Sequence, residues 1–149
     1  MKIGIYAGSF NPFHLGHYDI LIQAEQVFDK VILAVGENPE KSYQQRTELP
    51  DSVKNSSVVI KYNGLLTEMM AELNKQDKYN SLPLTLIRGL RNGHDLEYEQ
   101  NQIAFMKGLM PSLKVIFFIC DPKYQHVSSS ALRALRKFSE EEYNRYIVK

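Results

Sequence analysis

Five short apolar segments alternate with stretches of helical spacing along this chain, and this alternation is the strongest constraint on its fold. The apolar segments are rich in Ile, Val, Leu and Phe and cover residues 2–7, 30–35, 57–62, 84–88 and 114–119. Strands that alternate with helices are typical of a parallel sheet covered on both faces. We therefore expect an α/β fold, a doubly wound sheet of five parallel strands with helices on both faces.

The stretches between these segments carry helical periodicity. One apolar helical face is formed by His17, Leu21, Ala24 and Phe28, and further patterns begin at Leu65 and at Asp95, the latter reaching Met106. Such a pattern in a doubly wound sheet predicts a Rossmann-like arrangement, in which ligands bind beyond the carboxyl ends of the strands.

The remaining segments are predicted from their polarity. Residues 38–50 are polar and read as a mobile loop, and residues 74–82 read as a surface connection. Residues 138–149 predict a short charged helix with Tyr143, Tyr146 and Ile147 on one side.

Length and composition limit the possible classes of function. The 149 residues suit a single domain over residues 1–149, and 44% hydrophobic with 23% charged residues is typical of a globular protein. A net charge of +1, from 18 basic and 17 acidic side chains, argues against a general nucleic-acid binder. No apolar run is long enough for a signal peptide or a membrane span, so we expect a cytoplasmic protein without a membrane partner.

Cys120 is the single cysteine of the chain, and it lies at the end of an apolar run. One cysteine forms no intramolecular disulfide and no cysteine-based zinc site. We expect a buried structural thiol rather than a reactive one.

A turn of unusual composition follows the first apolar segment. Gly8, Pro12 and Gly16 shape it, and His14 and His17 lie at its end, where helical spacing begins. A strand, a tight turn and a helix N-terminus leave backbone N–H groups unpaired at the positive end of the helix dipole, where phosphate binds well. The segment therefore predicts phosphate chemistry.

The two histidines allow three interpretations. A metal pair is possible at this spacing, but a structural zinc site needs two further ligands, and His94 and His126 are isolated in the sequence. The imidazoles could instead be satisfied by backbone alone, or donate to phosphate oxygens whose charge grows during phosphoryl transfer. The glycines and proline around His14 and His17 favour the last interpretation, and we expect no dedicated metal site.

A second polar segment follows the fourth apolar run. Arg88 and Arg91 can bind phosphate oxygens in a bidentate manner or stack on a base, and apolar neighbours imply that this strand end is largely buried. Asp95 is predicted to be the N-cap of the next helix, and Glu99 shares its face.

Three serines precede the helix-forming residues 131–136. Ser128, Ser129 and Ser130 are therefore expected to cap a helix N-terminus and to present hydroxyl and N–H groups to an anion. A cap alone requires one serine, so three in a row favour contact with phosphate.

Taken together, three motifs resemble the phosphopantetheine adenylyltransferase family of the nucleotidyltransferase superfamily. Residues 8–17 are similar to the (T/H)xGH signature of the superfamily. Residues 86–91, followed by 95–99, look like a hallmark of the family, and residues 126–130 resemble its ISSS motif. The three occur in the expected order and cover most of the chain.

The resemblance implies roles for individual residues. His17 would be the catalytic residue. ATP would be bound by Ser9, Phe10, His17, Gly89, Leu90, Arg91, Glu99, Tyr124, Gln125, His126, Val127, Ser128, Ser129 and Ser130. The second substrate would be bound by Ser9, Lys41, Leu66 and Arg88. Leu66 could also be a simple core residue, and Lys41 could be a solvated lysine.

The resemblance also implies the reaction and the partners. AMP would pass from ATP to 4′-phosphopantetheine, giving dephospho-coenzyme A and pyrophosphate in coenzyme A biosynthesis, with Mg²⁺ on the triphosphate and a homohexameric assembly. Because the attacking phosphate is already anionic, no side chain needs to remove a proton or form a covalent intermediate.

Two other functions stay open. His14 stands where many family members have Thr, and a His-x-Gly-His sequence is common in nicotinate and nicotinamide mononucleotide adenylyltransferases. Ser9 and Asn11 also replace the usual Thr and Asp. A non-catalytic nucleotide-binding module is the third candidate.

Overall fold

The protein is built on one parallel sheet. The computed structural model describes residues 1–37 and 49–149. The strands are β1 (Ile3–Gly8), β2 (Lys30–Gly36), β3 (Val58–Tyr62), β4 (Leu84–Leu90) and β5 (Val115–Ile119), in the order β3-β2-β1-β4-β5. All four pairings are parallel, and Ile5 at the centre of β1 lies in register with Ile32 of β2 and Leu86 of β4. The predicted five-stranded parallel sheet is confirmed.

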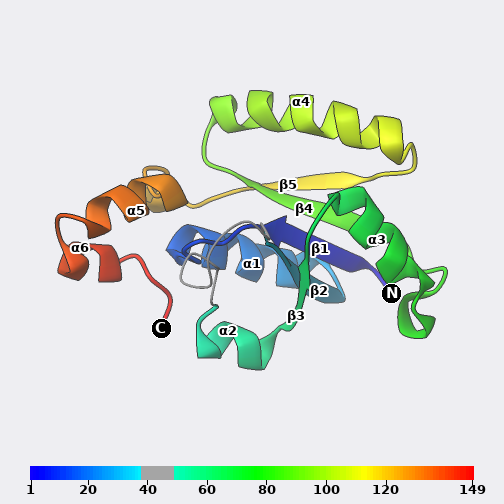
Figure 1. Ribbon diagram of the computed structural model, residues 1–149, viewed down its shortest axis with the longest axis horizontal. Helices are drawn as coiled ribbons and strands as arrows, with labels where there is room; N and C mark the ends of the chain where they lie inside the picture. Colours follow the sequence, from blue (N-terminus) through cyan, green and yellow to red (C-terminus); the bar gives the residue numbers. More distant parts are fainter. Residues whose placement is uncertain (38–48) are drawn as a thin grey trace.

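Helices cover both faces of this sheet (Figure 1). They are α1 (Leu15–Val27), α2 (Asp51–Ser56), α3 (Leu66–Lys75), α4 (Gly93–Leu109), α5 (Ser129–Arg136) and α6 (Glu140–Asn144), with short 3₁₀ turns η2 (Asp77–Tyr79) and η3 (Pro122–Tyr124). In Figure 1, α1 and α2 lie on one side of the strands and α3 and α4 on the other. The doubly wound, Rossmann-like arrangement is therefore the one expected.

Two hydrophobic cores result from this layering. Along β2, Leu33 and Val35 belong to the core under α1, whereas Ile32 and Ala34 belong to the core under α3 and α4. All four side chains are fully buried. A strand buried on both faces reads as a continuous apolar run, which is why the sequence identified it so clearly.

Several boundaries differ from the sequence prediction. β4 continues through Gly89 to Leu90, since both residues pair with β5. The helix α2 was not predicted, because only Val53 of its six residues is buried and the periodic signal is weak. Residues 74–82 are more than a surface connection, because Tyr79 is buried and the Asn74 amide donates to the Tyr79 and Leu82 carbonyls.

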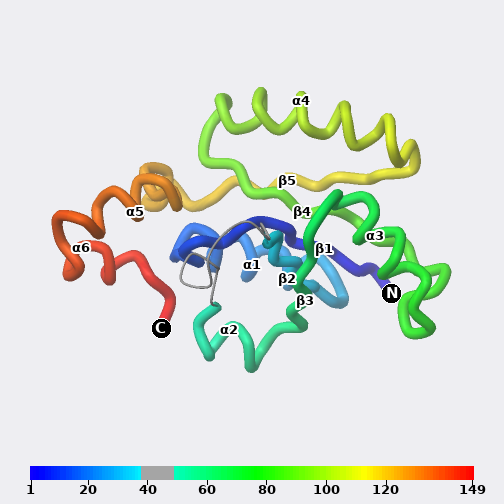
Figure 2. The backbone as a smooth tube through the Cα atoms, viewed as in Figure 1, coloured from blue at the N-terminus to red at the C-terminus, as the bar shows by residue number. Residues whose placement is uncertain are grey.

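The C-terminal segment returns to the start of α1. The helix α6 is shorter than the predicted 138–149, but Tyr143, Tyr146 and Ile147 do share a small core with Val127 and Leu132. Beyond α6, the Tyr146 carbonyl accepts from Leu15 N, and Ile147 forms an antiparallel bridge with His14. The tube in Figure 2 shows this return of the chain end toward α1.

Two further sequence predictions concern the loop at residues 38–50 and the lack of a membrane span. The loop predicted at 38–50 lies, except for its last two residues, outside the described residues, as does Lys41. None of the helices in the described ranges has the length and apolar character needed to cross a membrane.

Candidate active site

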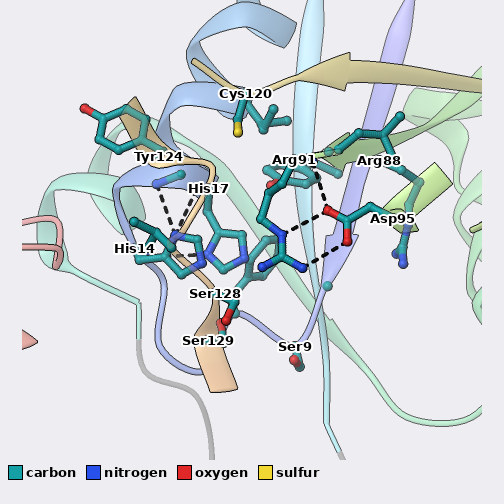
Figure 3. A pocket seen from close by; sticks show the side chains of 18 of the residues that line it. Ser9, His14, His17, Arg88, Arg91, Asp95, Cys120, Tyr124, Ser128 and Ser129 are labelled. Carbon is teal, nitrogen blue, oxygen red and sulfur yellow. Dashed lines mark hydrogen bonds and ion pairs between the residues drawn. The ribbon is translucent and has the colours of Figure 1, made fainter. Parts of the chain in front are cut away.

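The carboxyl edge of the sheet holds a cavity of about 360 Å³. Its walls come from the ends of β1, β4 and β5 and from the starts of α1, α4 and α5 (Figure 3). His17, Arg91 and Ser129, which lie far apart in the sequence, all line it. This is the location in which open α/β sheets bind ligands.

The two histidines of the turn form a reciprocal cap at the start of α1. His14 is the N-cap residue, and its Nδ1 accepts hydrogen bonds from Gly16 N at 3.0 Å and His17 N at 3.3 Å. In return, Nδ1 of His17 accepts from His14 N at 3.2 Å. The two rings stack with centroids 3.7 Å apart. Histidine thus replaces both partners of the usual Ser/Thr and Glu/Gln capping box.

This cap decides the protonation of both rings. Because Nδ1 of each ring accepts a backbone N–H, the ring proton of the neutral form lies on Nε2. Burial, with the nearby charge of Arg91, lowers the pKa of His14 to about 4. Burial, His14 and Arg91 lower the pKa of His17 well below its ordinary value. Both side chains are therefore neutral Nε2–H donors at pH 7, and backbone contacts do not use up their capacity to bind phosphate.

Aromatic side chains and a glycine hold this pair. The Phe10 ring meets His17 edge-on at 5.0 Å, and Phe13 lies 5.4 Å from His17. Phe10 itself has a φ of 47°, a left-handed conformation that is uncommon outside glycine and often accompanies functional sites. A Cβ on Gly16 would lie 2.9 Å from Cε1 of His14. Glycine at this position therefore lets the His14 ring fold back over the helix start.

Two arginines at the end of β4 are each bound by a carboxylate from α4. Arg88 donates from Nε and Nη2 to the two oxygens of Glu99 at 2.9 and 2.8 Å. Arg91 donates in the same way to Asp95, with both distances 2.9 Å. Among the described lining residues, the two positive charges are thus balanced by two negative ones.

The prediction that Asp95 caps α4 is wrong. The N-cap lies three residues earlier than expected, at Asn92, whose side chain accepts from Asp95 N at 3.0 Å. The Asp95 carboxylate is instead used by the Arg91 guanidinium and by Arg91 N. Partial burial opposes ionisation of Asp95, but the hydrogen bonds from Arg91 prevail and lower its pKa.

The serine segment caps α5 as predicted. Ser128 is the N-cap, and its Oγ accepts from Ala131 N at 3.1 Å. Ser129 donates from Oγ to the Pro12 carbonyl at 3.1 Å. That contact ties the start of α5 to the turn that carries His14 and His17, so the two helix N-termini open onto one cavity.

The structure places most, but not all, of the predicted site residues around this cavity. Those in its walls are Ser9, Phe10, His17, Arg88, Gly89, Leu90, Arg91, Glu99, Tyr124, Val127, Ser128 and Ser129. Gln125, His126 and Ser130 are exposed and lie outside the lining. Leu66 also lies outside it and packs against the core under α3.

Sequence reasoning missed several wall residues, among them Tyr98 and the thiol of Cys120. Cys120 is buried, as expected, and burial raises its pKa, which keeps the thiol protonated. Its position immediately after β5 could have placed it at the carboxyl edge.

The described residues offer no cluster of three or more His, Cys, Asp or Glu side chains suited to a metal ion. The two carboxylates at the cavity are engaged by arginine at both oxygens.

Comparison with known proteins agrees with this geometry. The cytidylyltransferase-like family model matches residues 5–135. A phosphopantetheine adenylyltransferase from Mycoplasma capricolum is 38% identical over 148 residues, covering 94% of this chain and 100% of that protein. One from Streptococcus sanguinis is 33% identical over 148 residues, covering 94% and 85%. The chain belongs to the phosphopantetheine adenylyltransferase family.

More distant structures share the fold of this phosphopantetheine adenylyltransferase family member. A bifunctional NMN adenylyltransferase/ADP ribose pyrophosphatase from Francisella tularensis superposes with a TM-score of 0.58 at 20% identity, covering 99% of this chain and 44% of that chain. At this identity the likeness shows the fold alone. The family resemblance inferred from the three motifs is confirmed.

Proposed function

We propose that this protein transfers AMP from ATP to 4′-phosphopantetheine, giving dephospho-coenzyme A and pyrophosphate in coenzyme A biosynthesis. Family membership supports this reaction class. The observation that carries the proposal is the convergence of two neutral imidazole donors, Arg91 and the serine-capped start of α5 on one cavity. Residues 1–149 would act as one nucleotidyltransferase domain, since the site draws on both ends of the chain.

The triphosphate would lie between the two helix N-termini. In this proposal the side chains of His17 and Arg91 and the backbone N–H of Ser129 donate to its oxygens, and the N-termini of α1 and α5 add favourable dipoles. The other predicted ATP contacts are retained as part of the proposal and are Ser9, Phe10, Gly89, Leu90, Glu99, Tyr124, Gln125, His126, Val127, Ser128 and Ser130.

The chemical step requires positioning and charge stabilisation. An oxygen of the acceptor phosphate attacks the α-phosphorus of ATP, and the bond from that phosphorus to the bridging oxygen breaks as pyrophosphate leaves. Charge on the transferred group is stabilised by the Nε2–H of His17, whose orientation is fixed by its Nδ1 contact. The neutral ring donates without giving up a proton.

ATP would enter as its Mg²⁺ complex, so that the ion is part of the substrate. Mg²⁺ commonly keeps several waters and binds through substrate phosphates, and this suits a cavity whose carboxylates already bind arginine. The ion would neutralise part of the triphosphate charge.

The acceptor would occupy the remainder of the cavity. Arg88 and Ser9, both in its walls, are proposed to contact the acceptor. Lys41 and Leu66 are carried over from the family resemblance alone.

We also propose a homo-oligomer, with the hexamer implied by the family as the expected state. Large apolar side chains are exposed on the outer helix and the edge strand, where Phe105 of α4 is 81% exposed and Ile119 of β5 is 68% exposed. Exposed apolar surface supports an interaction site on this side of the sheet. A cytoplasmic location, where ATP is available, completes the proposal.

Pyrophosphate release with a panel of phosphorylated acceptors tests the function. The purified protein is incubated with Mg²⁺, ATP and either 4′-phosphopantetheine, nicotinate mononucleotide or nicotinamide mononucleotide. Pyrophosphate release is expected with 4′-phosphopantetheine and with neither mononucleotide. Release with either mononucleotide instead would transfer the assignment to that acceptor, and ATP binding without release from any acceptor would indicate a non-catalytic module.

A further inference from the structure

Two polar side chains of α1 are hydrogen-bonded to the chain at the end of β5. Asp19 accepts at Oδ2 from Asp121 N at 3.0 Å. Gln23 donates from Nε2 to the Ile119 carbonyl at 3.0 Å, and the same Nε2 donates to Asp19 Oδ2 at 3.0 Å. The two side chains lie four residues apart and therefore on one face of the helix. We call Asp19 and Gln23 the α1 clamp.

The α1 clamp binds the backbone on both sides of Cys120. β5 is the edge strand of the sheet, and its pairing with β4 ends here, where Cys120 N donates to the Leu90 carbonyl at 2.9 Å. Ile119 comes directly before Cys120, and Asp121 directly after it. The clamp thus adds two hydrogen bonds to backbone groups at the place where the sheet pairing stops. Cys120, which lines the cavity, is held between these two bonds.

A series of short-range hydrogen bonds leads from the α1 clamp to the start of α5. The Asp121 carbonyl accepts from Tyr124 N at 2.9 Å, and the Tyr124 carbonyl accepts from Val127 N at 2.9 Å. These local bonds fix the shape of residues 121–128, but they do not fix where the segment lies relative to the rest of the cavity. The α1 clamp attaches one end of the segment to α1, and the contact of α5 with the turn before α1 attaches the other.

The α1 clamp therefore links two parts of the site that are far apart in the sequence. Asp19 lies two residues after His17 on the same helix. In the view of Figure 3, Cys120 and Tyr124 lie at the opposite end of the pocket from Ser9, with His17 between them. Movement of the end of β5 would change the distance between the Tyr124 wall and His17 and leave the Ser9 end in place. Binding and catalysis are sensitive to displacements of about 1 Å.

We propose that the α1 clamp, Asp19 with Gln23, positions the ATP-binding wall around Tyr124 by holding the end of β5. The role requires an oxygen at Asp19 that accepts two hydrogen bonds, and it does not require the negative charge. This inference rests on the proposed function, in which the wall formed by residues 124–129 binds ATP. It gives a role to two side chains that are not part of the cavity lining.

ATP binding tests the clamp directly, by calorimetry with ATP and Mg²⁺ and without acceptor. Asp19→Ala removes the acceptor of both bonds and is expected to raise the Kd for ATP about tenfold, the scale of one or two lost hydrogen bonds. Asp19→Asn keeps an oxygen that accepts both bonds, and its Kd should lie within about twofold of the wild-type value. Gln23→Ala should give an intermediate increase. Glu25→Ala and Gln26→Ala, at exposed positions of α1, are the matched controls and should bind ATP as the wild type does.

Steady-state kinetics of AMP transfer separate positioning of ATP from a general loss of structure. In Asp19→Ala the KM for ATP should rise with the Kd, whereas the KM for 4′-phosphopantetheine and kcat at saturating ATP should change less than about threefold. The acceptor is expected to be unaffected because Ser9 and Arg88 lie on or directly after β1 and β4 rather than at the end of β5.

The thiol of Cys120 reports on the end of β5 without any ligand. It is the single cysteine of the chain and is buried, so alkylation by an uncharged maleimide measures how often this strand end opens. Burial and the charge of Asp19 raise the pKa of the thiol, so loss of that charge alone speeds alkylation by favouring the thiolate. Asp19→Asn measures this charge effect. Asp19→Ala should react several-fold faster than Asp19→Asn, and Gln23→Ala faster than the wild type.

Three results would overturn the inference. Wild-type ATP affinity in Asp19→Ala would show that the clamp does not position the ATP wall. Equal losses of affinity in Asp19→Ala and Asp19→Asn would make the charge the cause, and equal alkylation rates in these two variants would show that the strand end does not depend on the clamp. If Asp19→Ala does not fold, Gln23→Ala against Gln26→Ala gives the same comparison.

Failure of the proposed function has a different signature. Absence of AMP transfer to 4′-phosphopantetheine by the wild-type protein would remove that function. The ATP calorimetry and the alkylation rates need no acceptor, so they would still decide whether Asp19 and Gln23 position the ATP wall.

Discussion

Helices α1 and α4 both begin at the cavity, but they are held there by opposite means. α1 buries Ile20, Leu21 and Ala24 against the sheet, and its first turn is closed by histidines only three residues apart. α4 buries only Glu99 and Ile103 among its 17 residues, and its first two turns are tied to β4 by ion pairs. The start of α1 is fixed by hydrogen bonds between neutral imidazoles and the backbone, and the start of α4 by ion pairs.

This difference determines which side chains hold the histidines and which hold the arginines of the site. The imidazoles of α1 are set before any ligand arrives, because backbone N–H groups fix their tautomer and burial fixes their charge. The arginines beside α4 depend on carboxylates from another element. As a result of this weak burial, α4 leaves several large apolar side chains exposed, among them Leu109 at 62% exposure.

The largest expected effect is on the α1 side, at His17. His17→Ala should lower turnover roughly 10²–10³-fold, the scale of one lost donor to developing charge, with a much smaller loss of ATP affinity. Pyrophosphate release and ATP calorimetry measure the two quantities. His94→Ala, at an exposed position near the start of α4, is the control. Turnover of His17→Ala equal to that of the wild type would contradict the assigned role.

A smaller effect on turnover is expected from a substitution that displaces the His14 ring from its capping position. Gly16→Ala places a Cβ 2.9 Å from the His14 ring, so the ring must move and its acceptor contacts weaken. We expect a loss of about 1 kcal/mol of stability, as for a lost N-cap, and a reduction of turnover by about tenfold. Chemical denaturation and the release assay measure both.

The matched control for this substitution is Gly108→Ala in α4. A Cβ there meets nothing within 4 Å, so replacing glycine in a helix should raise stability by up to ~1 kcal/mol. If Gly16→Ala and Gly108→Ala changed the unfolding free energy equally, the packing of His14 over Gly16 would contribute nothing to stability.

The neutral cap also predicts how stability depends on pH. The pKa of His14 is lowered to about 4, so below pH 6.5 the unfolded chain binds a proton that the folded chain does not. Stability is therefore fully present above this pH and falls as the pH drops toward 4, with a slope of up to ~1.4 kcal/mol per pH unit for each such histidine. Denaturant unfolding between pH 7 and pH 4 measures it.

A variant isolates the contribution of one ring to that slope. His14→Asn keeps a side-chain acceptor at the N-cap and removes the titrating imidazole, so the dependence should become shallower. An unchanged slope in His14→Asn would mean that His14 titrates in the folded protein as it does in the unfolded chain.

The smallest effect on the isolated chain is expected from the outer face of α4. Phe105→Glu should change the unfolding free energy of a monomer by no more than about 0.5 kcal/mol, because the ring is 81% exposed. It should nevertheless lower the molar mass in light scattering if this face joins copies of the chain. Gln100→Glu adds the same charge at an exposed position of α4 and serves as the control. Equal masses for wild type and Phe105→Glu would exclude this face as the interface.

Much of the fold could be predicted because its signals are local. Strands buried on both faces appear as unbroken apolar runs, and Ser128 followed by strong helix formers indicates a capped helix. The failures have two causes: a neighbouring side chain that competes for a capping group, and a helix too short to show a period. Asp95 is a residue type that often caps helices, but its carboxylate accepts from the Arg91 side chain, and Asn92 is the N-cap instead. The short α2 gives too few buried residues to produce a period.

The order of elements, the turn that carries His14 and His17 and the family can be predicted from the amino-acid sequence, because each depends on residues close together along the chain. The pairing of Arg88 with Glu99, the neutrality of His14 and the return of Tyr146 to the start of α1 are decided only by the tertiary structure. Burial and the charges of distant residues set these properties, and neither exists until the chain has folded.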